Sequence, residues 1–315
     1  MNEVKREEFW YDSRDEQTKI HAVRWVPACE KKKAVVQLVH GMTEHVMRYD
    51  AFAQFLAEQG ILVVANDHLG HGLSRRADMP YGYFCRRDPA TVVVRDVHRL
   101  KKITQENNPG VPYIILGHSM GSFILRNYLS RYGTGIQGAV IVGTGHPSAI
   151  KVNFGLIFAR IQSLIFGQKH VAKLLDSIIF SGYNAKSGQN RTESDWLNSQ
   201  SEEVDLYRDD PMCGYTFTLN GFITLFTLIK RACGKEAFKK VPADLPVLFL
   251  SGKEDPVGGC GKEVERAYGS FCDREMTEVS CKLYEGGRHE ILREKNKDEV
   301  FADILEFINR IIAAK

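Results

Sequence analysis

A serine flanked by glycines occupies a position where a nucleophile could be exposed. Residues 117–121 read Gly-His-Ser-Met-Gly, which fits the pattern G-x-S-x-G and occurs once in the chain. The serine, Ser119, follows the apolar run YIIL and precedes the helix-like segment FILRNYL. A sharp strand-to-helix turn lifts such a serine above a sheet, and the glycines allow close backbone packing. We therefore predict that Ser119 is a catalytic nucleophile.

A serine hydroxyl needs a neighbouring base, and in this setting the chain order is serine, then acid, then histidine. Of the ten histidines, His289 alone lies beyond residue 170, in the Gly-rich segment YEGGRHEIL that follows the last apolar run. The pKa of an imidazole lies near neutrality, so this side chain can accept a proton and return it. We predict that His289 is the general base.

The acid that orients this base should follow the preceding strand. The segment PVLFLSGKEDPVG supplies Asp255 at that place, with Glu254 as a weaker rival. Asp244 precedes the strand and Asp273 follows the next helix, so both lie at the wrong end. A carboxylate at position 255 would accept the imidazole N–H and stabilise the imidazolium. We predict a triad of Ser119, Asp255 and His289.

Acyl transfer passes through an oxyanion that needs preorganised N–H donors. One donor should be the residue after the nucleophile, Met120. The other should come from a loop after an earlier strand, and VVQLVHGMTEH supplies such a loop. We predict that the backbone N–H groups of Met42 and Met120 form the oxyanion hole.

The elements that must position these residues alternate between short apolar runs and amphipathic segments. Residues 5–11 and 18–26 resemble an antiparallel hairpin. Six apolar runs follow, at 33–41, 61–67, 113–119, 138–144, 246–255 and 281–287. Helical spacing marks 48–59, 91–107, 120–132 and 297–313. Strands of this kind alternating with helices predict an α/β fold with a mostly parallel sheet covered on both faces.

The alternation stops between about 146 and 240, where only helix-like pieces occur. We therefore expect a catalytic domain of residues 1–145 and 241–315, with a helical cap formed by 146–240. The apolar faces of 152–166 and 217–229 are expected to pack mainly on the catalytic domain, with a part lining an acyl tunnel or touching lipid. Charged and polar residues within 152–167 argue against a membrane span. The acidic stretch 202–210 is interpreted as a solvated loop with helix caps rather than a ligand site.

Composition excludes several classes of protein. The 315 residues are 43% apolar with a net charge of +3, which argues against a disordered chain and against a dedicated nucleic-acid-binding protein. Seven scattered cysteines and an N-terminal segment without an apolar core favour reduced thiols in a cytoplasm. The glycine pattern at 133–138 follows a helix and opens a strand, so it is not a dinucleotide site. Four histidines are interpreted as loop residues, so we expect no metal and no cofactor; they are His40, His45, His68 and His71.

Five segments together resemble the monoglyceride lipase and lysophospholipase branch of the α/β-hydrolase superfamily. They are HGMTEH (40–45), DHLGHGLS (67–74), GHSMGS (117–122), SGKEDPV (251–257) and GGRHE (286–290). The resemblance implies an eight-stranded sheet, a cap over the active site, and the same triad and oxyanion donors. That family often has a small residue where this chain has Met42, which implies a narrower acyl pocket here.

The expected activity is therefore hydrolysis of monoacyl lipid esters, either monoacylglycerols or lysophospholipids. The expected partner is a lipid ester, with transient contact to a membrane or micelle through the cap. Two alternatives are a small-ester carboxylesterase or serine peptidase of the same fold, since a fold does not set the substrate. A third is a non-catalytic receptor for an apolar ligand, against which the complete triad argues.

Overall fold

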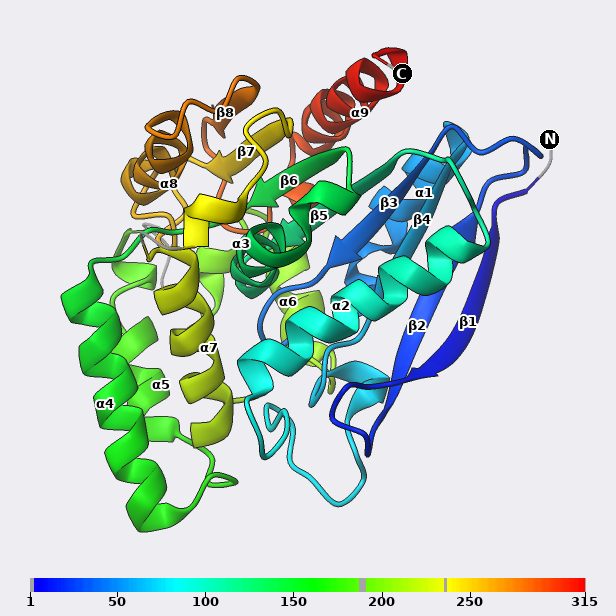
Figure 1. Cartoon of the computed structure of the whole chain (residues 1–315). Helices are drawn as coiled ribbons and strands as arrows, with labels where there is room; N and C mark the ends of the chain where they lie inside the picture. Colours follow the sequence, from blue (N-terminus) through cyan, green and yellow to red (C-terminus); the bar gives the residue numbers. More distant parts are fainter. Residues whose placement is uncertain (1–2, 187–190, 235–236, 315) are drawn as a thin grey trace.

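The central feature of the computed structural model is one eight-stranded sheet (Figure 1). The structure describes residues 3–186, 191–234 and 237–314. The strand order is β1-β2-β4-β3-β5-β6-β7-β8. The strands are β1 (Lys5–Asp12), β2 (Lys19–Val26), β3 (Ala34–Val39), β4 (Ile61–Asn66), β5 (Tyr113–His118), β6 (Gly138–Val142), β7 (Val247–Gly252) and β8 (Val279–Tyr284). β2 runs antiparallel to both of its neighbours, and β3 to β8 are parallel. The predicted hairpin and the mostly parallel eight-stranded sheet are confirmed.

Helices cover both faces of this sheet. α1 (Asp50–Glu58) and α9 (Lys297–Ala313) pack with one set of alternating strand residues into one core. The other face is covered by α2 (Pro89–Glu106), α3 (Met120–Tyr132) and α8 (Lys262–Cys272). The central strands β3 to β7 are buried along their whole length, which explains their continuous apolar sequences. Parallel order brings the carboxyl ends of β3, β5, β7 and β8 to the same edge.

Four helices lie between the adjacent strands β6 and β7. They are α4 (Ala149–Phe166), α5 (Lys173–Phe180), α6 (Ser201–Asp209) and α7 (Leu219–Ala232). Figure 1 shows α4, α5 and α7 together, to one side of the sheet. α7 is buried against α3 and shares the core of that face of the sheet. The acidic stretch 202–210 is largely the helix α6, so its interpretation as a loop was wrong.

The outer face of α4 and α5 differs from the expected packing. Gly155, Leu156 and Ala159 are buried on the inner face of α4, but Leu164 is 88% exposed and Ile150 is 82% exposed. Among the described residues, one helix is long and apolar enough to cross a membrane by length and composition, and it is α4, with 22% of its residues buried. Most apolar side chains on this face therefore do not pack on the catalytic domain.

Candidate active site

The turn between β5 and α3 places Ser119 in a strained backbone conformation. Ser119 has φ +53° and ψ −120°, a region that residues with a side chain rarely adopt. A Cβ atom on Gly121 would lie 2.0 Å from the carbonyl oxygen of Val39, and one on Gly117 would lie 2.4 Å from the carbonyl oxygen of Gly121. Only glycine fits at these two positions, so the G-x-S-x-G pattern is a steric requirement of the turn.

Asp255 and His289 meet at the carboxyl ends of β7 and β8. The Nδ1 atom of His289 lies 2.9 Å from Oδ2 of Asp255, and both side chains are buried. Burial alone would raise the pKa of Asp255, but the imidazole and the hydrogen bonds from Val257 and Ser251 hold that pKa below its usual value. The rival acid Glu254 is 48% exposed and faces Arg288 instead.

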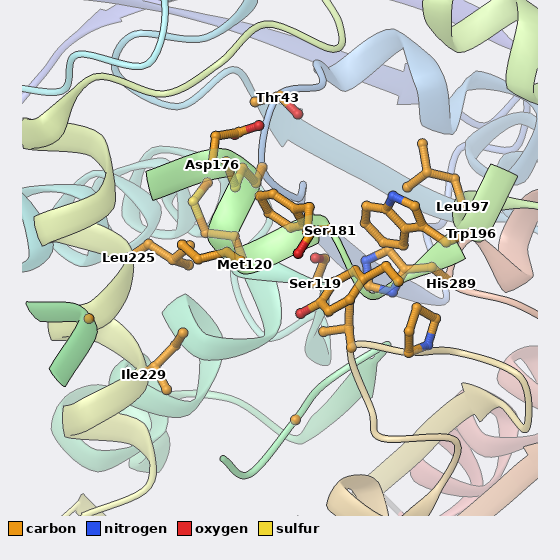
Figure 2. A pocket seen from close by; sticks show the side chains of 18 of the residues that line it. Thr43, Ser119, Met120, Asp176, Ser181, Trp196, Leu197, Leu225, Ile229 and His289 are labelled. Atoms are coloured by element: carbon orange, nitrogen blue, oxygen red, sulfur yellow. The ribbon is translucent and has the colours of Figure 1, made fainter. Parts of the chain in front are cut away.

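The side chains of Ser119, Met120 and His289 line the same cavity (Figure 2). Met42 lines it as well. The ring of Trp196, from the segment between α5 and α6, contacts the ring of His289 with 5.2 Å between centroids. The structure therefore brings all five predicted site residues to one place.

A buried carboxylate supports the loop that carries Met42. Oε1 of Glu44 accepts hydrogen bonds from the backbone N–H of Gly41 at 2.5 Å and from the hydroxyl of Tyr49 at 2.8 Å, and lies 3.3 Å from Nδ1 of His118. Burial opposes ionisation of Glu44, but His118, Arg48 and Tyr49 lower its pKa to about 2. The loop is thus held around a permanent negative charge.

The hydrogen-bond network around Glu44 extends to His289. Although burial disfavours the charged ring, Glu44 raises the pKa of His118. Nε2 of His118 lies 3.1 Å from the carbonyl oxygen of His289, a distance suited to an N–H donor on this ring. Arg48 contacts the carboxylates of Glu290 and Glu44. Its Nη2 donates to both oxygens of Glu290 at 2.6 and 2.8 Å, and its Nε lies 3.7 Å from an oxygen of Glu44. Charge pairing therefore connects the loop of Met42 to the loop of His289.

Three of the four histidines that the sequence singled out are buried behind the oxyanion loop. His40 accepts a hydrogen bond from the backbone N–H of His68 at 2.9 Å, and His68 Nε2 lies 3.1 Å from the carbonyl oxygen of His40. Nδ1 of His71 lies 2.9 Å from the carbonyl oxygen of Leu69. Burial lowers the pKa of His68 to about 3, that of His71 to about 4, and that of His40 well below its usual value. The rings are neutral packing elements, whereas His45 lies apart and pairs with Asp210.

The cavity above Ser119 has a volume of about 860 Å³ and combines apolar walls with carboxylates. Leu225 and Ile229 of α7 lie on one side of the catalytic residues and Trp196 and Leu197 on the other (Figure 2). Further apolar lining comes from Phe154, Phe158, Leu175, Ile179, Phe180 and Phe226. Such a lining suits a long apolar substrate group whose reactive end lies at Ser119.

Acidic residues outnumber basic residues in this lining. Among the described residues, this lining contains one lysine, Lys151, and no arginine. Three lining carboxylates, Asp176, Glu193 and Glu263, form no ion pair with any residue that the structure describes. Burial, aided by the charge of Glu193, raises the pKa of Asp176 to about 6. The polar part of the cavity is therefore negatively charged near neutral pH.

Comparison with known proteins identifies the family to which this chain belongs. Residues 30–296 match the family described as serine aminopeptidase S33. The chain belongs to the serine aminopeptidase S33 family. It is 30% identical to a monoglyceride lipase of Rattus norvegicus over 286 residues, which are 90% of this chain and 84% of the relative. It is 28% identical to a monoacylglycerol lipase of Mycolicibacterium smegmatis, covering 90% of each chain. The predicted resemblance to the monoglyceride lipase branch is thereby confirmed.

A solved structure agrees with the architecture of this S33 family member. A thermostable carboxyl esterase from Bacillus coagulans, in complex with glycerol, superposes with a TM-score of 0.89 at 30% identity, over 98% of this chain and 99% of that one. The predicted α/β-hydrolase fold is confirmed, and the protein is a serine hydrolase of the S33 family.

Sequence reasoning missed the residues that support the S33 catalytic centre. Glu44 and His118 stand inside two of the quoted motifs, but their spacing in the chain gives no sign that they meet. Trp196 comes from a segment with no motif of its own, and Asp176 from a mostly apolar helix. Contacts between segments this distant leave no periodic signal in the sequence.

Proposed function

We propose that this protein hydrolyses carboxylic esters of monoacyl lipids, with monoacylglycerols as preferred substrates. The observation that carries the proposal is the cavity in which Ser119 and His289 lie between apolar walls, with Asp255 hydrogen-bonded to His289. The acyl chain would occupy the apolar part, and the ester carbonyl would lie against Ser119. The relatedness to monoglyceride lipases supports the same assignment.

In the proposed reaction, Ser119 attacks the ester carbonyl while His289 accepts its proton. The N–H groups of Met42 and Met120 stabilise the oxyanion, and Asp255 stabilises the imidazolium through the 2.9 Å contact. His289 then protonates the leaving alcohol, and water hydrolyses the acyl-enzyme by the same route. The reaction needs only the residues of the chain and water.

The charge of the cavity favours an uncharged head group over a phosphate. Two like unit charges about 8 Å apart repel by about 1 kcal/mol at an effective dielectric constant of ~40. Asp176, Glu193 and Glu263 would each repel a phosphate, and Lys151 alone would attract it. Of the two substrate classes left open by the sequence, a monoacylglycerol therefore fits better than a lysophospholipid.

The nucleophile is tested first. Ser119→Ala should lower the turnover of 1-oleoylglycerol by about 10⁶-fold, because the triad acts as a unit. Labelling of the parent protein by a fluorophosphonate probe should disappear in the variant. Substantial esterase activity in the variant would refute the triad assignment, and an unlabelled, inactive parent would favour the non-catalytic receptor.

The head-group preference is tested with two substrates that differ by one phosphate, 1-oleoylglycerol and 1-oleoylglycerol 3-phosphate. At pH 8 the parent should prefer the uncharged ester in kcat/KM. The double variant Asp176→Asn with Glu193→Gln should reduce that preference by about 30-fold, because two charges at about 1 kcal/mol each are removed, while the exposed Glu202→Gln on α6 should leave it unchanged. An unchanged preference in the double variant would refute the electrostatic argument without touching the ester hydrolase assignment.

The helical segment 146–240 is proposed to act as a cap that touches a lipid surface, in a cytoplasmic protein. Exposed apolar side chains outside the cavity lining cover the outer face of α4 and the start of α5; they are Ile150, Ile157, Ile161, Leu164, Ile165, Phe166 and Leu174. The exposed cations Arg160, Lys169 and Lys173 lie close to them in the chain, and no acidic residue occurs between 149 and 175. Such a face suits the interface of an anionic membrane. Because its inner face packs on α7, α4 would lie on the membrane rather than cross it.

Vesicle sedimentation tests this contact. The protein should bind vesicles that contain phosphatidylglycerol, and Ile157→Glu with Leu164→Glu should reduce binding by at least 10-fold. Leu206→Glu is the matched control, because Leu206 is 57% exposed on α6, outside this face. Equal binding by both variants would refute the assigned surface.

A second function, cleavage of short peptides with a free amino terminus, is favoured by one observation. The unpaired carboxylates Asp176, Glu193 and Glu263 could also hold an ammonium group. A panel of aminoacyl anilides, p-nitrophenyl esters and monoacylglycerols separates the alternatives. Higher kcat/KM for the anilides than for the monoacylglycerols would establish the peptidase and overturn the lipid assignment.

A further inference from the structure

A histidine, a carboxylate and a thiol converge beside the oxyanion loop, outside the catalytic residues. His45 lies directly before the 3-10 turn Val46–Tyr49, and Asp210 and Cys213 lie between α6 and α7. Nε2 of His45 is 2.8 Å from Oδ2 of Asp210. The ligand atoms of all three residues lie within 4.8 Å of one another. His45 and Cys213 are buried, and Asp210 is partly exposed.

The charges around this cluster suit a dication. The ionised groups that act on Cys213 are one cation, Arg48, and three carboxylates, Asp210, Glu44 and Glu290. Arg48 is already paired with Glu290 through two short hydrogen bonds. These four groups carry a net charge of −2, which becomes −1 when the ring of His118 beside Glu44 is protonated, and a bound dication would offset the remaining negative charge. An excess of buried negative charge without a counter-ion is costly.

We propose that His45, Asp210 and Cys213 form a binding site for Zn²⁺ or a dication of similar ligand preference. A set of one nitrogen, one oxygen and one sulfur ligand matches zinc and not Mg²⁺ or Ca²⁺. Water would supply the fourth ligand from the exposed side of Asp210. Binding breaks the S–H bond of Cys213 and releases its proton to solvent. The proton that Nε2 of His45 donates to Asp210 must also leave, and transfer through solvent to Nδ1 frees the lone pair of Nε2 for the metal.

The rearrangement required is small. Bond lengths of about 2.0–2.3 Å in a tetrahedral site separate the ligand atoms by roughly 3.3–3.8 Å. Oδ2 of Asp210 must therefore withdraw from His45 by about half an ångström, and the widest of the three separations must close by up to about 1 Å. Asp210 ends α6 in an extended conformation and is partly exposed, so this segment can move without disturbing the core.

The site would join two parts of the chain that meet at the active site. His45 belongs to the loop of Met42, and the segment of Asp210 and Cys213 already touches this loop through the hydrogen bond from the N–H of Gly214 to the carbonyl of Thr43, at 3.0 Å. A metal bond across the same junction would fix the helical insertion to the oxyanion loop. We expect bound zinc to raise the unfolding temperature, because the metal binds the folded state alone at this geometry.

Cobalt gives a direct readout of thiolate ligation. The full-length protein, freed of metal by chelation, is titrated with Co²⁺, and one equivalent should produce a thiolate-to-metal band in the near ultraviolet together with tetrahedral d–d bands. Cys213→Ser should abolish the near-ultraviolet band. Cys233→Ser should retain it, because that thiol lies beside Arg126 and is not part of a cluster of potential metal ligands among the described residues. Asp210→Asn should weaken cobalt binding by at least 10-fold.

Zinc added to the parent should also raise the unfolding temperature, and this increase should be lost in Cys213→Ser. Absence of the thiolate band in the parent, or its persistence in Cys213→Ser, would overturn the site. If Cys213→Ser does not fold, the comparison of Asp210→Asn with the parent decides: equal cobalt affinity for the two proteins overturns the proposal, and a 10-fold loss supports it.

Discussion

Lowering the pH from 7 to 4.5 should destabilise this protein through the three buried histidines beside the oxyanion loop, His40, His68 and His71. In the unfolded chain each ring binds a proton below about pH 6.5. In the folded chain His71 does so only near pH 4 and His68 near pH 3. Between these values the unfolded state binds more protons, so the free energy of unfolding falls as the pH falls.

The magnitude follows from the number of protons. Three rings that remain neutral in the folded state contribute about 4 kcal/mol per pH unit. Asp96 opposes them, because burial raises its pKa to about 7, so the folded state keeps a proton that the unfolded state releases above about pH 4. For these four groups together the free energy of unfolding falls by about 3 kcal/mol per pH unit between pH 6 and 4.5, which is a large share of a typical total of 5–15 kcal/mol.

Urea unfolding at a series of pH values measures this slope, and His71→Phe isolates one ring. A phenyl ring suits this position because His71 packs against the rings of Phe84, Tyr215 and Phe217. The variant should show a slope smaller by about 1.4 kcal/mol per pH unit. The exposed His170→Phe should leave the slope unchanged. Equal slopes for His71→Phe and the parent would refute the argument that this ring is held neutral.

Three further outcomes are expected. Asp255→Asn should lower kcat by about 10⁴-fold with little change in KM, measured on a monoacylglycerol, because the amide favours the wrong imidazole tautomer; a loss below 10-fold would contradict the assigned acid. Gly121→Ala should cost about 3 kcal/mol in thermal unfolding, since its Cβ would lie 2.0 Å from a carbonyl oxygen of β3. The control Gly269→Ala, in α8 with no atom within 4 Å of the added Cβ, should be stabilising by about 0.5–1 kcal/mol. Glu290→Gln should cost about 3–5 kcal/mol, because it leaves the buried Arg48 without its bidentate partner, and an unchanged unfolding temperature would contradict that pairing.

The sheet and the five candidate residues could be predicted because each depends on a local pattern. Ser119 needs a sharp turn with glycines on both sides, and Asp255 and His289 each follow a recognisable apolar strand. The strand order then places these three residues at the same edge of the sheet.

The support network could not be predicted in this way. Glu44 reaches His118 across 74 positions of the chain, and Arg48 reaches Glu290 across 242. Which polar residues become partners depends on the packing of whole elements. The outer face of α4 was misjudged for a related reason: an apolar helical stripe predicts burial, but it does not say whether protein or lipid covers it.

The helices α4 to α7 leave the sheet after β6 and return at β7, which is the neighbouring, hydrogen-bonded strand. The two attachment points are therefore fixed by the sheet, whatever lies between them. Insertions, deletions or complete replacement of this segment should change which esters the enzyme accepts, while β6 and β7 keep their hydrogen-bonded register. The fold thus separates the part that selects a substrate from the part that cleaves it, and each can diverge in evolution without the other.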